Sequence, residues 1–361
     1  MTKRNSSDSN SAETSVLKSI HKFNENQWNN LVTHTERGTL FHRHEWLAAV
    51  EDGYDYEPNH IVVSENSNPV AILPNFVSTV SAPSHLAKQA VSATSLSMMK
   101  SGGPGYGGPV IANDERENMD RLFDALDATD DYRILYHLIS TADLEQVRYG
   151  QYLRSRGYEP KSSVATFLLD LTDGWDTILS DMEKSRRKAI RRAHEQDYNV
   201  EMTTLGDNLH QTYRMYEKNI DRVNGNLIPF SFFEALREHV GSRVRVCRAE
   251  VEGELVGKYV YFLDTEGSCL HHWVSAIPNR ECYDSYPSEL MHAHAIKWGI
   301  EQEFDRYSFG PSGSHFNNSV FKFKNRYGPK VVPMLRWEKG ENPLLWPLFK
   351  YARQQFAEQG L

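Results

Sequence analysis

A short segment near the end of the 361-residue chain combines residue types that bind phosphate groups. Residues 323–328 read FKNRYG, so two cations lie between aromatic residues just before a glycine. Lysine offers a phosphate a point charge, arginine adds a planar fork of donors, and glycine allows close backbone approach. We therefore interpret Phe323, Lys324 and Arg326 as binding a phosphate-bearing ligand. The alternative is an edge strand, because aromatic and basic residues alternate over 321–324.

A second concentration of positive charge lies in residues 184–193, where six of ten residues are Lys or Arg. The apolar residues in and just before this stretch recur with helical spacing, which predicts a helix over 181–195 with one packing face and one basic face. A basic face is either an ordinary solvated surface or a polyanion site that makes charge-assisted contacts. The candidates for anion binding are Arg186, Arg187 and Arg191.

Histidine is the residue type here that best suits proton transfer at neutral pH. His271 and His272 follow each other on a predicted strand, and an unperturbed imidazole with a pKa near 6.5 can accept a proton from an amine. His292 and His294 are two residues apart on a predicted helix, so they do not share a face. Because no Cys or carboxylate lies beside them at a metal-ligand spacing, we expect no metal site.

Composition limits the classes of protein that the chain can form. A length of 361 residues with 39% hydrophobic residues favours two domains. The net charge of -8 and the pI near 6.0 argue against a nucleic-acid scaffold, so anions must bind at local clusters. The absence of an apolar run of roughly 20 residues and of a signal peptide, with only three cysteines, predicts a cytoplasmic protein without a transmembrane segment.

The first half of the chain reads as a polar tail followed by one alternating α/β unit. Residues 1–15 are Ser-, Asn- and Asp-rich and predict a disordered tail. Residues 101–109 hold five glycines and two prolines and predict a loop. We place a domain boundary near Pro160, which gives an N-terminal domain over 16–160. Periodicity predicts helices from Asn24, from Arg43, over 115–128 and over 144–156, with strands at 60–63, 70–74 and 133–139.

The second half repeats this alternation and ends in a characteristic order of elements. A three-stranded antiparallel meander is followed by a long helix and a returning strand. The C-terminal domain covers 161–337, and residues 338–361 form a C-terminal helix. Ser231 and Glu234 have the spacing of a capping box at a helix start. The predicted elements are a strand at 164–171, helices at 209–219 and 231–239, meander strands at 243–249, 255–263 and 269–276, a helix at 289–303 and a strand at 306–309.

Taken together, these features resemble the Fem family of peptidyltransferases and the related Fem-like branch of the GNAT acyltransferases. The resemblance spans residues 25–335 and implies an α/β (α+β) fold of two tandem GNAT-like domains, each with a mixed central sheet flanked by helices. Its carriers are Thr39-Leu40-Phe41-His42 with Glu45-Trp46, Ile72-Leu73-Pro74, Ser185-Arg186-Arg187 with Ile190-Arg191-Arg192-Ala193, Tyr286-Pro287-Ser288 with Leu290, Phe309-Gly310, and Phe323-Lys324 with Tyr327-Gly328.

The resemblance also implies a reaction and its participants. It implies an acyltransferase that binds no permanent cofactor and uses acyl-CoA or aminoacyl-tRNA as co-substrate. The acceptor would be an amine of a cell-envelope or polysaccharide precursor. Phe323 and Lys324 would lie beside the phosphates of the donor, with Arg326 next to them. His271 or His272 would border the cleft, and His272 or Tyr286 would handle a proton or hydrogen-bond the acceptor.

Two departures from the family patterns bear on the donor. Residues 278–284 lack the Arg/Gln-x-x-Gly-x-Gly/Ala loop that wraps the pyrophosphate of CoA, which argues against plain acetyl-CoA. No long coiled-coil insertion follows the basic helix, so engagement of tRNA does not follow either. The alternatives are an acyl-CoA-dependent N-acyltransferase acting on a sugar amine, and a non-catalytic module whose basic helix docks on RNA or on an anionic membrane surface.

Overall fold

The computed structural model of the protein describes residues 12–80, 96–129, 131–141, 144–162, 164–314 and 317–359. Residues 1–11 of the predicted tail lie outside the described residues. Residues 13–15 were also predicted to be disordered, and this is wrong, because they belong to strand β1 (Glu13–Leu17). β1 pairs antiparallel with strand β3 (His60–Glu65), and Leu17 packs against the core.

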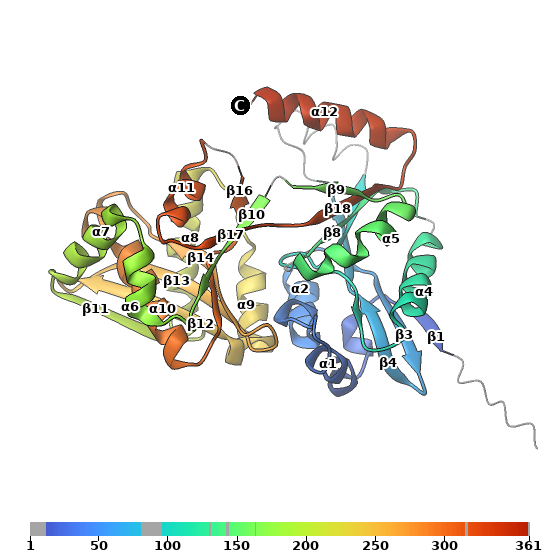
Figure 1. Cartoon of the computed structure of the whole chain (residues 1–361), viewed down its shortest axis with the longest axis horizontal. Helices are drawn as coiled ribbons and strands as arrows, with labels where there is room; N and C mark the ends of the chain where they lie inside the picture. Colours follow the sequence, from blue (N-terminus) through green and yellow to red (C-terminus); the bar gives the residue numbers. More distant parts are fainter. Residues whose placement is uncertain are drawn as a thin grey trace, which may run out of the picture.

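The N-terminal half contains two sheets covered by helices (Figure 1). One sheet has the strand order β1-β3-β4-β7 and the other β2-β5-β6-β8-β18-β9. Besides β1 and β3 its elements are β2 (Glu57–Pro58), β4 (Asn68–Leu73), β5 (Asn75–Thr79), β6 (Ser97–Ser101), β7 (Val110–Ile111), β8 (Ile134–Ser140), β9 (Glu159–Lys161), α1 (Glu25–Thr33), α2 (His44–Gly53), α4 (Glu115–Asp127) and α5 (Gly150–Ser155), with short 3-10 turns at 20–22, 40–42 and 144–149.

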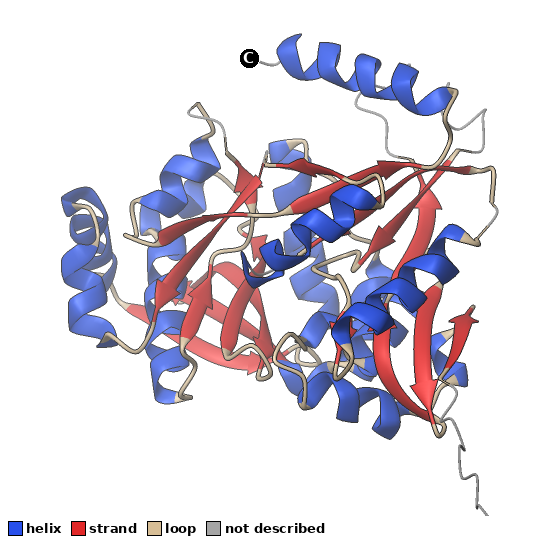
Figure 2. Cartoon of the chain, turned by 45° about the vertical axis from the view of Figure 1, so that its right-hand side comes forward, coloured by secondary structure: helices blue, strands red, loops and turns tan. Residues whose placement is uncertain are grey.

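The C-terminal half is built on one sheet with the order β11-β12-β13-β14-β15-β10-β16, and β17 also pairs with β10. Figure 2 shows its helices lying beside the strands. The elements are β10 (Val164–Asp170), β11 (Tyr198–Thr204), β12 (Val244–Val251), β13 (Glu254–Asp264), β14 (Cys269–Ala276), β15 (Arg306–Ser308), β16 (Ser312–Gly313), β17 (Lys330–Pro333), α6 (Gly174–Asp181), α7 (Lys184–His194), α8 (Leu209–Val223), α9 (Phe230–His239), α10 (Pro287–Glu301) and α11 (Ser319–Asn325).

The end of the chain returns to the N-terminal half. Strand β18 (Arg336–Gly340) inserts between β8 and β9, and helix α12 (Leu345–Gln359) follows it across that sheet (Figure 1). Residues 338–340 are therefore strand, where we predicted the start of a C-terminal helix. The predicted domain limits did not include this return, because pairing with a distant strand leaves no local signal.

Most predicted elements are present, and the mixed α/β fold is confirmed. The antiparallel meander, the long helix α10 and the returning strand β15 lie where the periodicity placed them. The capping box is wrong: α9 begins after Pro229, and the Ser231 hydroxyl donates to the Gly53 carbonyl at 2.7 Å. The edge-strand alternative for 321–324 is also wrong. These residues form helix α11, whose first turn is capped by the Asn318 side chain at 2.9 Å from the Phe321 nitrogen.

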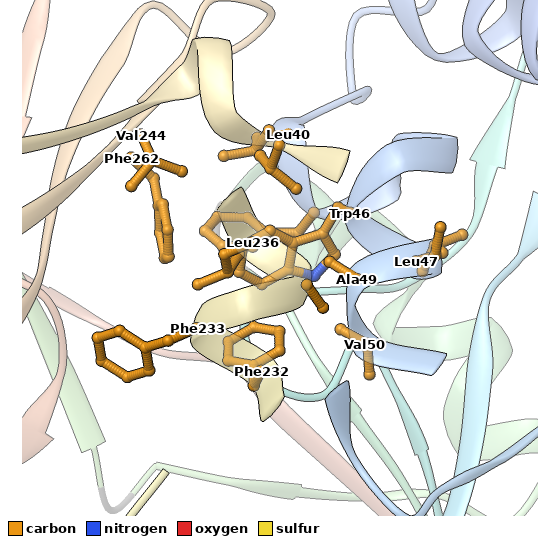
Figure 3. Packing of buried hydrophobic residues seen from close by; sticks show 14 of the residues in the cluster. Leu40, Trp46, Leu47, Ala49, Val50, Phe232, Phe233, Leu236, Val244 and Phe262 are labelled. Atoms are coloured by element: carbon orange, nitrogen blue, oxygen red, sulfur yellow. The ribbon is translucent and has the colours of Figure 1, made fainter. Parts of the chain in front are cut away.

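One hydrophobic core joins the two halves. Trp46 of α2 meets Phe232 of α9 and Phe262 of β13 edge to face, with ring centroids 5.8 and 5.0 Å apart (Figure 3). Gly53 at the end of α2 allows this approach, because a Cβ there would lie 2.5 Å from the Phe232 Cα. Such continuous packing holds the halves in a fixed relation and so fixes the cavities that they share. Among the described residues no helix is long and apolar enough to cross a membrane.

Strands β14 and β15 diverge at the centre of the C-terminal sheet. They pair in parallel only from Cys269 opposite Arg306 to His271 opposite Ser308. Beyond that point the Phe309 nitrogen donates to the Phe167 carbonyl of β10 instead. From His272 onward, no described strand pairs with this edge of β14, which leaves backbone groups free to meet a ligand.

Candidate active site

A cavity of about 440 Å³ opens beside the diverging strands of the C-terminal half. Its walls are formed by strands β13 and β14 and by helices α8, α10 and α11, which are far apart in the sequence. The lining residues are Asn219, Arg222, Val223, Tyr259, His272, Ser275, Tyr283, Ser288, His292, Ser319, Val320, Phe323 and Lys324.

A β-bulge in β14 brings two polar side chains into this cavity. Val260 and Tyr261 of β13 pair with Val274 and His272, so Trp273 is an extra residue on β14. Side chains three residues apart on a regular strand point to opposite faces. The bulge shifts this alternation, so that His272 and Ser275 line the same cavity and the Ser275 hydroxyl lies 3.3 Å from His272 Nε2.

His272 is an uncharged imidazole at neutral pH. Burial, and secondarily the charge of Lys324, lower the pKa of His272 to about 3. Its ring lies against Tyr259 and His292, with centroids 4.5 and 5.0 Å away. A neutral imidazole can donate one hydrogen bond and accept another, but so low a pKa makes His272 a weak proton acceptor. The site therefore suits orientation of an amine better than complete removal of its proton.

Lys324 forms the most deeply placed charge of the cavity. Its Nζ donates to the carbonyls of Gly310 and Pro311 at 2.9 and 3.0 Å. The side chain is only 9% exposed, no described carboxylate forms an ion pair with it, and burial lowers the pKa of Lys324 to about 7. When Lys324 is protonated, its ammonium group has three N–H donors, so one remains for a ligand oxygen. Gly310 permits the close fit, because a Cβ there would lie 3.0 Å from the His272 carbonyl.

Arg186 acts inside the protein, which differs from the anion-binding role that we predicted for it. Its guanidinium lies between the rings of Phe323 and Tyr327, 4.5 Å from each centroid, and forms an ion pair with Glu289. The side chain is 5% exposed, so little of it faces solvent. Cation–π contacts of a desolvated arginine are worth roughly 2 kcal/mol. Arg186 thus fixes α11 against α10 and orients Phe323 towards the cavity.

The remaining predicted residues lie away from the cavity. Arg187 donates to the carbonyls of Ser180 and Met182, and Arg191 is exposed on α7. Arg326 is half exposed, with Nε 3.6 Å from a carboxylate oxygen of Glu183. Tyr286 does not line the cavity; its hydroxyl lies 3.4 Å from Arg192. Of the predicted site residues, the cavity therefore contains His272, Phe323 and Lys324.

Several lining residues were not predicted. The Tyr259 hydroxyl donates to Ser288 Oγ at 2.8 Å. At the rim, Arg222 donates to Asn219 at 2.7 Å and to the Tyr283 hydroxyl at 3.0 Å. Arg222 had no sequence signal, because it is one charge among many on the polar face of α8. Tyr259 falls in an apolar strand pattern, where a buried aromatic residue is the ordinary expectation.

A second, smaller cavity of about 70 Å³ lies between the two halves, on the opposite face of β14. His271 enters it, with Nε2 3.5 Å from Asp264 and Nδ1 3.9 Å from the Cys269 sulfur. Burial opposes charge on His271, yet Cys269 and Asp264 outweigh it and raise the pKa of His271 to about 10. The alternation of β14 thus separates the two predicted histidines. The N-terminal half contributes Glu36, Arg37, Gly38, Thr39, His42, Tyr106, Gly107 and Gln146 to this cavity.

Comparison with known proteins identifies the fold of the chain. Residues 180–322 match the acetyltransferase (GNAT) domain family. No curated protein sequence matches the chain. The crystal structure of FemX is similar, with a TM-score of 0.69 and 12% sequence identity over 93% of this chain and 99% of that chain.

Two further solved structures share the arrangement. The C-terminal domain of a putative lysylphosphatidylglycerol synthetase from Agrobacterium fabrum has a TM-score of 0.56 and 12% identity over 91% of this chain and 94% of its own. A tandem GNAT protein from the clavulanic acid biosynthesis pathway has a TM-score of 0.56 and 10% identity over 92% of this chain and 99% of its own. The chain therefore has the tandem GNAT fold, and residues 180–322 of its C-terminal half match an acetyltransferase domain.

Proposed function

We propose that the protein transfers an acyl or aminoacyl group from a phosphate-bearing carrier to an amine of a cell-envelope or polysaccharide precursor in the cytoplasm. The carrier is acyl-CoA or aminoacyl-tRNA. The chain shares its fold with FemX and with a lysylphosphatidylglycerol synthetase domain, and for this reason we consider aminoacyl donors as well as acyl-CoA. The observation that carries the proposal is the cavity beside the diverging β14 and β15, with Lys324 inside it and an unpaired strand edge along it.

The cavity offers two places for the donor. Arg222 is partly exposed and lies beside the buried Asn219, so a phosphate of the carrier can accept hydrogen bonds from Arg222 while it stays in contact with solvent. Lys324 lies deeper, beside the point at which the strands part. In this arrangement the carrier phosphate binds Arg222, and the acyl carbonyl reaches the free donor of Lys324. This moves the phosphate contact predicted for Lys324 and Arg326 to a residue on α8.

The chemistry requires little beyond positioning. The amine nitrogen attacks the acyl carbonyl, a C–N bond forms, the bond to the thiol or hydroxyl of the carrier breaks, and the proton of the amine leaves with that group. Holding two reactants in line can supply about 7–11 kcal/mol of the barrier reduction. A donor aimed at the developing oxyanion is worth about 3–4 kcal/mol more, a role that fits Lys324 and the free edge of β14.

The donor can be identified by adding each carrier to the purified protein. A ligand that binds only the folded state must raise the melting temperature. We expect acyl-CoA or charged tRNA to raise it, and the same carrier to support acyl transfer to an amine. Replacement Arg222→Ala should lower the affinity for that carrier about tenfold or more, whereas Arg191→Ala on the exposed face of α7 should not.

Two results would contradict the proposal. Binding of RNA or of anionic vesicles that depends on Arg191 and is abolished by salt, without turnover of any acyl carrier, would identify a binding module instead. An unchanged affinity in Arg222→Ala would remove the phosphate site at the rim. Acyl-CoA turnover with an amino sugar, and none with charged tRNA, would select the sugar-amine alternative within the same reaction class.

A further inference from the structure

Two cations that form no ion pair with any described carboxylate lie on one face of the six-stranded sheet in the N-terminal half. Lys100 of β6 pairs with Leu138 of β8, and Arg336 of β18 pairs with Ser140 on the other side of β8. Paired residues share a face of the sheet, and so do residues two apart on one strand. Lys100, Ser140 and Arg336 therefore project from the same face, beside the loop that follows β6.

All three side chains have unused hydrogen-bonding capacity. Arg336 Nε and Ser140 Oγ are buried and have no hydrogen-bond partner. No described carboxylate forms an ion pair with Lys100, and burial, followed by the charge of Arg336, lowers the pKa of Lys100 to about 8. Both cations are still partly exposed, so a ligand can reach them.

Two acidic residues described on this face already bind other cations. Arg353 of α12 donates to both oxygens of Glu338 at 3.0 and 2.6 Å. Glu159 accepts from Lys350 at 2.6 Å and lies 3.8 Å from Lys161. Glu338 also attracts Arg336, but burial outweighs this attraction and lowers the pKa of Arg336. Among the described residues, the positive charge of this face is therefore only partly neutralised. Partly buried like charges without a partner are unfavourable, and an anion between them removes that penalty.

The spacing of the strands suits one tetrahedral anion. Neighbouring strands are about 4.8 Å apart, so β6 and β18 are separated by about 10 Å with β8 between them. Lys100 lies opposite Leu138 and Arg336 opposite Ser140, so their Cα atoms are about 12 Å apart. Long side chains from the two outer strands can meet over the Ser140 hydroxyl. A phosphate dianion matches two cations in charge, and its oxygens accept from the fork of Arg336, the ammonium of Lys100 and the hydroxyl of Ser140.

This face also connects with the cavity between the two halves. Tyr106, from the loop after β6, interacts electrostatically with Arg336 and hydrogen-bonds Thr166. Thr166 lies 3.4 Å from Ser308, and all three of these residues line the smaller cavity. Ser308 pairs with His271 at the last step before β14 and β15 part. A ligand bound by Lys100 and Arg336 would therefore lie near the smaller cavity. That cavity leads to the point where β14 and β15 part, from the side opposite to the proposed donor cavity.

We infer that Lys100, Ser140 and Arg336 bind a phosphate group, and that this group belongs to the acceptor. The second part rests on the proposed function, because only an acyltransferase has an acceptor. The first part stands on the N-terminal half alone.

Binding of inorganic pyrophosphate tests the site directly. Its affinity is measured calorimetrically at constant ionic strength for the wild type, Lys100→Met, Arg336→Met and the control Lys330→Met, whose side chain is exposed in the C-terminal half. We expect Lys100→Met and Arg336→Met each to weaken one pyrophosphate site at least tenfold, and Lys330→Met to bind like the wild type. Without pyrophosphate, both variants should melt no lower than the wild type, because each loses a like-charge repulsion.

Equal affinity in all four proteins would overturn the site. A variant that melts lower without ligand would show instead that its cation is held by the protein, which also contradicts the inference. Lys100→Arg keeps the charge and should retain binding, so it separates loss of charge from loss of packing. The assay contains no acyl carrier. Absence of pyrophosphate binding would therefore not contradict acyl transfer, and absence of acyl transfer would not contradict the phosphate site.

Discussion

The buried ammonium of Lys324 should make the stability of the protein depend on pH in a defined direction. Burial lowers the pKa of Lys324 from 10.5 to about 7. Between these values the unfolded chain keeps the proton and the folded chain has lost it. The free energy of unfolding therefore rises with pH in that window, and below pH 7 the full unfavourable effect of the buried charge is present.

The size of the effect follows from the shift. Each pH unit inside the window changes the contribution of Lys324 by about 1.4 kcal/mol. From pH 7 to pH 9 the wild type should gain roughly 2 kcal/mol relative to Lys324→Met, which has a similar shape and no charge. Urea denaturation at pH 6, 7, 8 and 9 measures both proteins, and their difference cancels the titration of all other groups.

A matched control distinguishes burial from charge. Lys330 is 77% exposed, so Lys330→Met should follow the wild type in parallel across the same pH range. Parallel curves for Lys324→Met and the wild type would refute the reasoning, because they would mean that Lys324 keeps its ordinary pKa in the folded state. The cavity would then admit enough water to solvate the ammonium.

Three further changes test the contacts that hold the site. Gly53→Ala places a Cβ against the Phe232 backbone and should lower the free energy of unfolding by about 1–3 kcal/mol in urea; an unchanged value would contradict the tight packing of the halves. Arg186→Met leaves Glu289 buried without its partner and should cost about 3 kcal/mol or more, whereas an exposed, anion-binding Arg186 would cost little. His272→Gln should lower turnover at least tenfold while the melting temperature stays within a few degrees, because an amine would be oriented less well; full activity would exclude a role of His272 in the transfer.

Sequence reasoning located the elements whose pattern is local. The meander and α10 have strong periodicity and clear turns, so their positions follow from spacing alone. Lys324 was predicted as a ligand-binding residue because it lies between aromatic residues shortly before a glycine, and it does line the larger of the two cavities described above.

The environment of individual side chains was beyond this kind of inference. Arg186 and Arg191 look alike in the sequence, yet Arg186 faces α10 and Arg191 faces solvent. The two residues are five positions apart on one helix, which rotates one side chain by about 140° relative to the other. Likewise the bulge at Trp273 has no signature in composition. It results from the pairing with β13, and it decides that His272 and Ser275 share the cavity.

Each half has one pair of parallel strands at its centre, but the pairing is continuous in one half and interrupted in the other. This difference explains why the proposed donor cavity lies beside the sheet of the C-terminal half. In the N-terminal half, β6 and β8 stay paired from Ser97 to Ser101, and β18 occupies the other edge of β8. In the C-terminal half the parallel pairing ends after three residues, and β14 bulges away. A closed pair leaves no room for a carrier between the strands, so the binding that we propose for Lys100 and Arg336 takes place on the face of this sheet and involves a different group.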